Sequence, residues 1–262
     1  MIDRDDIICT DKFLNIASNN IIYLKTDLLA HGLQKINWRN NEHVLHPGKV
    51  WITGHSDYPI DRELFNKYEK NCEVWFAINK NVENSKIIGI PLGITNNTCE
   101  SHLHPIYGNL DIMVEVMQMP KDIKNLVYMN FNICTFKVER QMCYDMFCSK
   151  QWVTKGTINN TVEGRKDFLI EIRNHKFVLC PRGNGIDTHR LWETLYMGSI
   201  PIVKRCSTIN EFADLPILFI DEWSDLTIEL LEEKYAEIIG KTWNMEKLKF
   251  SYWKKIINEY AM

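Results

Sequence analysis

The chain has 262 residues, of which 45% are hydrophobic and 25% charged, a composition typical of a globular protein and not of a disordered or fibrous one. Its 31 basic and 34 acidic side chains leave a net charge of -3 and no local basic patch, which argues against a nucleic-acid partner. No apolar run reaches the roughly 18 residues of a membrane span, and the first residues are acidic where a secretory signal is basic, so we expect a cytoplasmic protein.

The first half of the chain contains four short runs of β-branched and aromatic residues. They predict strands at 21–25, 50–53, 74–78 and 87–90. The segment 61–70 between the second and third runs is expected to be helical. This half has the less regular pattern of the two.

In the second half, short apolar runs alternate with longer amphipathic segments, which is typical of the βα units of a parallel sheet. Strands are predicted at 126–133, 151–154, 177–180, 200–203 and 216–220, and helices at 136–149, 161–174, 188–197, 226–239 and 245–260. Thr161 is expected to cap its helix, and Gly198 stands where a left-handed residue ends one. The pattern predicts a doubly wound α/β unit.

A polar stretch around Pro120 separates the two halves, and no long linker or internal repeat is visible. We therefore expect two units, 1–120 and 121–262, each near the usual size of a domain. A cleft between two such units is where a ligand is expected.

The segment 181–193, PRGNGIDTHRLWE, is the most informative one for function. It follows a predicted strand and opens a helix, and ligands of open α/β sheets bind at such a place. Gly183 and Gly185 allow the backbone to approach a ligand, and N–H groups at a helix start accept phosphate oxygens. Arg182 and Arg190 can add paired donors to a diphosphate, and Glu193 can accept hydrogen bonds from ribose hydroxyls.

The segment 181–193 is compatible with more than one function. It is not a Walker loop, because no Gly-Lys-Ser/Thr follows, and it lacks the third glycine of the dinucleotide fingerprint. A glycine-rich turn with a solvated Arg–Glu pair would account for the same residues without any ligand. The loop alone does not decide between these alternatives.

A wider pattern around the loop resembles a known family. The stretch 175–203, HKFVLCPRGNGIDTHRLWETLYMGSIPIV, resembles the donor-binding core of exostosin-like glycosyltransferases, in particular the short versions encoded by large algal and amoebal DNA viruses. The resemblance continues upstream in YMNFNI at 128–133 with Glu139-Arg140, and downstream in DLPILF at 214–219. It is weaker in GHSDYP at 54–59 and WFA at 75–77.

The resemblance implies a GT-B architecture, in which two Rossmann-like domains face a cleft and the C-terminal domain holds a nucleotide sugar. It also implies transfer without a metal ion, and no Asp-x-Asp motif follows the predicted strands of the second half. By the same resemblance Glu193 binds the ribose and Arg140 a phosphate or the donor sugar. The diphosphate-binding residues are Arg182 and the loop residues Gly183, Asn184, Gly185, Asp187 and Thr188.

A transfer that inverts the anomeric centre needs a group that takes the proton from the acceptor hydroxyl. Asp57 and His55 follow the predicted strand 50–53 at its carboxyl end, where either side chain can face the cleft. We favour Asp57 over His55, because carboxylates commonly serve as the base. A purely structural alternative is that Asp57 caps the helix that begins near Asp61.

These expectations combine into one functional hypothesis with two rivals. The leading hypothesis is a metal-independent, inverting glycosyltransferase that moves a sugar, by resemblance xylose, from a UDP-sugar to a glycan acceptor, in the host cytosol if the chain is viral. The first rival is a catalytically silent module of the same fold that binds nucleotides or glycans. The second is a nucleotide-dependent α/β enzyme such as an epimerase, which would hold a nicotinamide.

Overall fold

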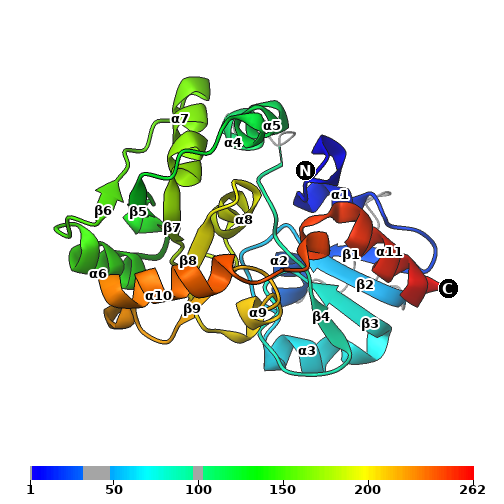
Figure 1. Ribbon diagram of the computed structural model, residues 1–262. Helices are drawn as coiled ribbons and strands as arrows, with labels where there is room; N and C mark the ends of the chain where they lie inside the picture. The colour runs from blue at the N-terminus through cyan, green and yellow to red at the C-terminus, as the bar shows by residue number, and fades with distance from the viewer. Residues whose placement is uncertain (1, 32–47, 97–102) are drawn as a thin grey trace.

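The computed structural model describes residues 2–31, 48–96 and 103–262. It is a mixed α/β structure with one parallel sheet of four strands and another of five. The two sheets lie in opposite halves of the molecule, and both chain termini lie beside the first sheet (Figure 1).

The first sheet has the order β1-β2-β3-β4 and all its neighbours are parallel. The strands are Ile21–Lys25 (β1), Gly48–Gly54 (β2), Cys72–Ala77 (β3) and Ile87–Gly89 (β4), which confirms the four strands predicted for this half. The helices of this part are Thr10–Leu14 (α1), Thr26–Ala30 (α2), Arg62–Tyr68 (α3), His104–Tyr107 (α4) and Leu110–Gln118 (α5). The apolar faces of α2 and α3 and the strands enclose buried side chains such as Trp51 and Trp75, whereas α4 and α5 pack against a helix of the second half, Val162–Arg173.

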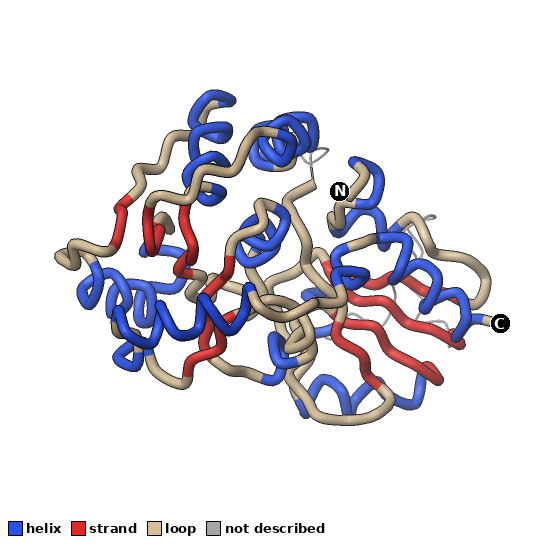
Figure 2. Tube along the Cα trace, in the orientation of Figure 1, coloured by secondary structure: helices blue, strands red, loops and turns tan. Residues whose placement is uncertain are grey.

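The second sheet has the order β6-β5-β7-β8-β9 and is parallel throughout. Its strands are Asn125–Met129 (β5), Val153–Lys155 (β6), His175–Leu179 (β7), Ile200–Lys204 (β8) and Leu218–Ile220 (β9). The helices are Lys137–Phe147 (α6), Val162–Arg173 (α7), His189–Tyr196 (α8), Ser207–Asn210 (α9), Ile228–Ile239 (α10) and Phe250–Ala261 (α11). Most of these helices lie around the strands of the second sheet, whereas α11 lies beside the first sheet (Figure 1 and Figure 2).

The second half follows the predicted pattern closely, with two differences at element ends. The predicted strand 126–133 ends at Met129, because the Asn130 side chain turns to donate hydrogen bonds to Tyr128 and to the Thr157 carbonyl. The predicted helix 245–260 is split into a 3-10 helix, Met245–Leu248, and α11, because Lys249 between them has extended backbone.

Two local predictions about helix ends are confirmed. The Thr161 hydroxyl accepts a hydrogen bond from the Gly164 N–H at 3.0 Å and so caps α7. Gly198 has a φ of 74°, the left-handed conformation that glycine adopts at low cost after a helix.

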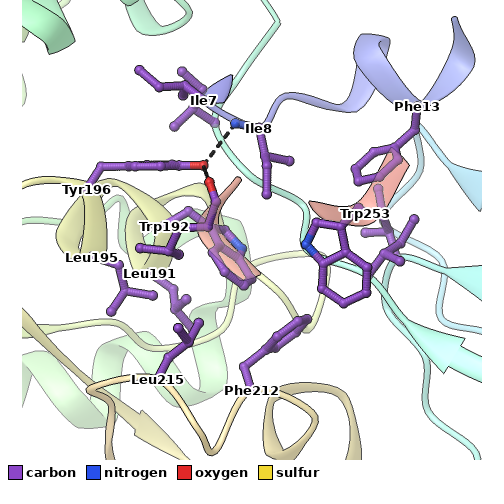
Figure 3. Packing of buried hydrophobic residues seen from close by; sticks show 14 of the residues in the cluster. Ile7, Ile8, Phe13, Leu191, Trp192, Leu195, Tyr196, Phe212, Leu215 and Trp253 are labelled. Atoms are coloured by element: carbon purple, nitrogen blue, oxygen red, sulfur yellow. Dashed lines mark hydrogen bonds between the residues drawn. The ribbon is translucent and has the colours of Figure 1, made fainter. Parts of the chain in front are cut away.

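The core between the two sheets joins segments that are far apart in the chain. Phe212 makes edge contacts with Trp192 and Trp253, whose ring centroids lie 4.9 and 6.4 Å away (Figure 3). The Tyr196 hydroxyl accepts a hydrogen bond from the Ile8 N–H at 2.9 Å and donates one to the Leu248 carbonyl at 2.8 Å. One hydrophobic cluster therefore includes side chains from both halves.

Two further features connect the halves. The last helix, α11, packs against β2 of the first sheet, although it ends the chain (Figure 1). The Lys80 ammonium, on a side chain only 4% exposed, pairs with the Glu211 carboxylate from the second half. Close by, the Thr208 hydroxyl donates to the Lys80 carbonyl at 2.6 Å.

None of the helices in the described ranges is both long enough and apolar enough to cross a bilayer.

Candidate functional site

A cavity of about 870 Å³ lies where the carboxyl ends of both sheets meet. From the first half it is lined by residues of α1 and α4, by the last residue of β1 and by residues that follow β2 and β4. From the second half it is lined by residues that follow β5, β6 and β7. Ligands of parallel sheets bind at this end of the strands, because the connecting loops and helix N-termini gather there.

The strand order of the second sheet marks one place within this cavity. In chain order its strands run 2-1-3-4-5, so the connections leave β5 and β7 in opposite directions. Such a switch point opens a crevice outside the carboxyl ends of the two strands. Asn130 and Asn132 after β5 and the loop 181–188 after β7 stand at that crevice.

The structure brings ten of the eleven predicted site residues to the cavity wall. His55 and Asp57 come from the first half, and the rest come from α6, the loop after β7 and α8. The latter are Arg140, Gly183, Asn184, Gly185, Asp187, Thr188, Arg190 and Glu193.

Arg182 is the predicted site residue that does not line the cavity. Its guanidinium lies 4.3 Å from the centre of the Phe136 ring and donates to the Asn184 carbonyl at 3.1 Å. In this arrangement the Arg182 side chain contacts Phe136 and its own loop, and its predicted role in binding a diphosphate stays a prediction.

Arg140 is buried and most of its donors are used by the protein. Its guanidinium donates to the carbonyls of Arg182 and Asn132, both at 2.8 Å, and to the Thr135 hydroxyl at 2.9 Å. Burial, with a smaller contribution from nearby Arg190, lowers the pKa of Arg140 to about 10. Arg140 therefore shapes the glycine loop and adds positive charge to the wall, in addition to any ligand contact.

The glycine loop is in contact with the first half. A Cβ atom on Gly185 would lie 3.0 Å from the Asn79 amide nitrogen and 3.3 Å from a carboxylate oxygen of Asp57. The Asn79 side chain accepts a hydrogen bond from the Asp187 N–H at 2.8 Å. Gly185 thus provides the space in which the loop meets the first half, a role that the sequence did not reveal.

Asp187 joins the loop to two partners and is itself buried. Its carboxylate accepts hydrogen bonds from the Leu92 N–H at 2.8 Å and from the Trp192 indole at 2.8 and 2.9 Å. Burial raises the pKa of Asp187 to about 7, in spite of these donors. The main role of Asp187 that follows from the structure is to fix the loop against the first half.

Arg165 is a site residue that the sequence did not suggest. Its side chain is fully buried in the cavity wall, with a guanidinium nitrogen 2.7 Å from a carboxylate oxygen of Glu193. The contact has the distance of an ion pair without the angles of a hydrogen bond, and within the described part of the chain none of the three guanidinium nitrogens has a hydrogen-bond partner. One signal in the sequence was a cation close to the start of a helix, where the helix dipole disfavours it.

Arg190 continues this positive wall. Its guanidinium lies 4.9 Å from the centre of the Phe168 ring, and that of Arg165 lies 5.5 Å from the same ring. Two buried nitrogens of Arg190, Nε and Nη1, also have no hydrogen-bond partner. Buried donors without partners are costly, so these two arginines mark a place where a ligand can supply acceptors.

The first half contributes a hydrogen-bonded network around His55. The His55 ring lies 2.8 Å from the Tyr23 hydroxyl through Nδ1 and 2.7 Å from an Asp11 carboxylate oxygen through Nε2. His55 has a φ of 51°, an uncommon left-handed conformation for a residue with a side chain. Burial lowers the pKa of His55, and the neighbouring Asp11 partly opposes this effect.

Asp57 lies two residues after His55 in the loop that follows β2. Its side chain is exposed, and one of its carboxylate oxygens lies close to Gly185. It does not cap the following helix. The cap of α3 is Asp61, whose carboxylate accepts from the Leu64 N–H at 2.9 Å. The structural alternative considered for Asp57 is therefore wrong.

Potential metal ligands do not cluster in the described part of the chain. Within residues 2–31, 48–96 and 103–262 there is no group of three or more histidine, cysteine or acidic side chains that could hold a metal ion. The chain does contain one Asp-x-Asp triplet, Asp3-Arg4-Asp5, at its start. These residues do not line the cavity, and Arg4 there pairs with Asp111 at 2.6 Å.

The fold and the cavity together define a mixed α/β protein with a candidate ligand site at the carboxyl ends of two parallel sheets. Residues 131–256 match the family described as the RXYLT1 C-terminal domain. No curated protein matches the chain. The matched segment contains Arg140, Arg165 and the loop through Glu193, whereas His55 and Asp57 lie outside it.

The match suggests a glycosyltransferase family related to xylosyltransferases. It agrees with the exostosin-like resemblance predicted from the same part of the sequence, and it implies sugar and acceptor substrates. A viral origin stays a prediction.

Proposed function

We propose that the protein is an inverting glycosyltransferase that moves a sugar, xylose in the first instance, from a UDP-sugar to a glycan acceptor without a metal ion. Its two units, 1–120 and 121–262, then form a GT-B arrangement of Rossmann-like domains that face the cavity. The cytosolic location predicted from the sequence belongs to the same proposal.

The observation that carries the proposal is the wall formed by Arg165, Arg190 and Glu193 at the switch point of the second sheet. Apart from the ion pair between Arg165 and Glu193, the two arginines offer N–H donors that have no acceptor among the described residues. Phosphate oxygens are strong acceptors for guanidinium groups. Glu193 presents a carboxylate in the same wall, and ribose hydroxyls can donate to it.

The charge of the cavity wall also supports a nucleoside diphosphate as the ligand. Among the described residues of the second half that line the cavity, three arginines face two carboxyl groups, Glu193 and Asp187. Because burial raises the pKa of Asp187 to about 7, this carboxyl group is only partly ionised at neutral pH. The wall therefore carries excess positive charge, which matches the negative charge of a nucleoside diphosphate.

The chemistry needs a leaving-group side and an acceptor side. The second half stabilises the departing diphosphate with its arginines, as preorganised cations do for developing negative charge. The acceptor hydroxyl approaches from the first half, where Asp57 and His55 are the residues that the sequence predicts for proton removal.

The test is titration of the full chain with UDP by isothermal calorimetry. We expect saturable one-to-one binding that falls by about tenfold or more in Glu193→Gln, since a hydrogen-bonded charged group contributes about 1.5–3 kcal/mol. Asp221→Asn, an exposed carboxylate paired with Arg205, is the control and should leave affinity unchanged. No binding, or equal binding by both variants, would overturn the donor site. Bound nicotinamide in the absorbance spectrum would favour an epimerase instead.

A further inference from the structure

We infer that Asp11 is the group that takes the proton from the attacking hydroxyl, and that His55 is the residue that positions Asp11. This inference rests on the proposed function. It assigns the acceptor-side chemistry to a carboxylate from α1 that the sequence did not single out.

Asp11 lies on the acceptor side of the cavity. It is the second residue of α1, its side chain is 32% exposed, and it lines the cavity from the first half. One carboxylate oxygen lies 2.7 Å from Nε2 of His55.

Both ring nitrogens of His55 are used by the protein. A carboxylate oxygen at 2.7 Å requires Nε2 to carry the hydrogen, because a carboxylate can only accept. Nδ1 then accepts from the Tyr23 hydroxyl at 2.8 Å. The Asn96 amide nitrogen, 3.1 Å from Nε2, is a donor and cannot replace Asp11 as the acceptor. His55 therefore has no free nitrogen for a substrate proton.

Asp57 stands on the wrong side of the sugar to be the base. Its carboxylate faces Gly185, in the loop proposed to hold the diphosphate. In an inverting displacement the nucleophile attacks from the face opposite the leaving group, so the base belongs on the far side of the sugar. Asp57 lies next to the donor loop, whereas the Asp11 carboxylate contacts His55 of the first half.

The strained backbone at His55 agrees with a positioning role. His55 keeps a φ of 51°, and uncommon backbone conformations of this kind persist where the surrounding structure over-determines them. Here the Tyr23 and Asp11 contacts hold the ring from both sides. The ring in turn fixes the direction of the Asp11 carboxylate.

Atoms and electrons balance in the proposed step. The acceptor oxygen forms a bond to the anomeric carbon, and the bond from that carbon to the phosphate oxygen breaks with its electron pair leaving on UDP. The hydroxyl proton moves to the Asp11 carboxylate. Water can replace the acceptor, which gives free sugar and UDP.

Comparison of two nucleophiles tests the base directly. UDP release from UDP-xylose is measured for the full chain in water and in added sodium azide, which attacks without losing a proton. We expect Asp11→Asn to lower release in water by about a hundredfold or more and to retain release with azide. UDP affinity, measured by calorimetry, should be unchanged, and Asp221→Asn serves as the control for both reactions.

His55 is tested through graded replacement. We expect His55→Ala to lower kcat in water while KM for UDP-xylose stays unchanged, and His55→Gln, which keeps an N–H donor, to recover part of that loss. The inference is wrong if His55→Gln or Asp57→Asn instead lowers UDP release in water by the full hundredfold while UDP release with azide persists. The residue that shows this pattern is then the base.

Two further outcomes separate this inference from the proposed function. If Asp11→Asn loses both reactions but still binds UDP, Asp11 is structural and the base assignment is overturned while the donor site stands. If the wild-type chain binds UDP but releases no UDP from UDP-xylose with either nucleophile, the assignment of Asp11 as the base is overturned. This outcome favours the catalytically silent nucleotide-binding module. A chain that binds no UDP overturns the proposed function itself.

Discussion

Arg140 and Arg190 are two arginines in the same cavity wall whose guanidinium groups are used differently. Arg140 donates to three carbonyls and a hydroxyl of the protein, whereas two buried nitrogens of Arg190 have no hydrogen-bond partner among the described residues. A buried donor that the protein leaves without a partner is available to a ligand. The first arginine is therefore structural in the main, and the second is the better candidate for ligand binding.

This contrast gives a paired prediction. Arg190→Met should weaken UDP binding by about tenfold or more, because charge-assisted hydrogen bonds to phosphate are lost, and should change the free energy of unfolding little. Arg140→Met should lower the free energy of unfolding by about 3 kcal/mol, because the carbonyls of Arg182 and Asn132 lose their donor. Urea unfolding and UDP titration of both variants check it, and the same loss of stability in both would contradict it.

Asp187 gives a prediction about pH. Its folded-state pKa of about 7 is above the ordinary value near 3.8, so the folded state binds more protons than the unfolded state between these values. The contribution of Asp187 to stability is therefore highest below pH 4 and decreases as the pH rises through 7, by about 4 kcal/mol in all. Asp187→Asn removes this dependence.

The measurement is urea unfolding of wild type and Asp187→Asn at pH 5 and pH 8. We expect the variant to gain stability relative to wild type at the higher pH, whatever the cost of the altered hydrogen bonds to Leu92 and Trp192 at the lower one. Since the remaining titrating groups are common to both proteins, their effects cancel. Parallel pH profiles would contradict the raised pKa.

At the scale of elements, the start of α7 determines the position of Arg165. The Thr161 hydroxyl caps this helix through the Gly164 N–H, one residue before Arg165. Gly164 is buried, and a Cβ atom there would meet Asn159 at 2.5 Å. The first turn of α7 is therefore packed tightly against the preceding loop, and this packing directs the Arg165 side chain into the cavity wall.

A pair of cap variants tests this connection. Thr161→Ala should cost about 1 kcal/mol of stability and weaken UDP binding by up to about tenfold, because fraying at the start of α7 displaces Arg165. Thr227→Ala removes the equivalent cap of α10, where the Leu230 N–H lies 3.2 Å from the hydroxyl, and should cost a similar amount of stability. Since α10 does not line the cavity, UDP affinity should stay at the wild-type value.

The whole molecule is held together by contacts between its halves. α11 packs against β2, and Trp253 in that helix contacts Phe212 of the second half. The buried Lys80 ammonium pairs with the partly exposed Glu211 carboxylate across the same boundary, so the pair is only partly screened by solvent. The two units are therefore expected to unfold together.

Scanning calorimetry checks this expectation. We predict one transition for the full chain, with its midpoint raised as a whole by saturating UDP, because a ligand stabilises the entire cooperative unit that binds it. Trp253→Ala, which opens a cavity in the shared core, should cost about 3–5 kcal/mol and lower the same single midpoint. Two transitions, only one of which responds to UDP, would contradict a single cooperative unit.

The sequence predicted the strands well because their signal is local. Each strand buried in a parallel sheet has apolar neighbours on both faces, so it stands out as a short apolar run, and the strand at 21–25 has the same limits in the structure. The glycine loop after β7 was also visible, because a strand followed by glycines and a helix start is a contiguous pattern. Gly198 and the Thr161 cap belong to the same class of local features.

The tertiary structure alone decided which side chains share the cavity. Arg165 lies in an ordinary amphipathic helix, and Asp11 and Asn79 lie in segments without any distinctive motif. They reach Glu193, His55 and the glycine loop only because the two halves pack with the carboxyl ends of their sheets together. Likewise, Arg182 has a favourable position in sequence, yet its side chain packs against Phe136. Local sequence determines elements, whereas the direction of a side chain depends on long-range packing.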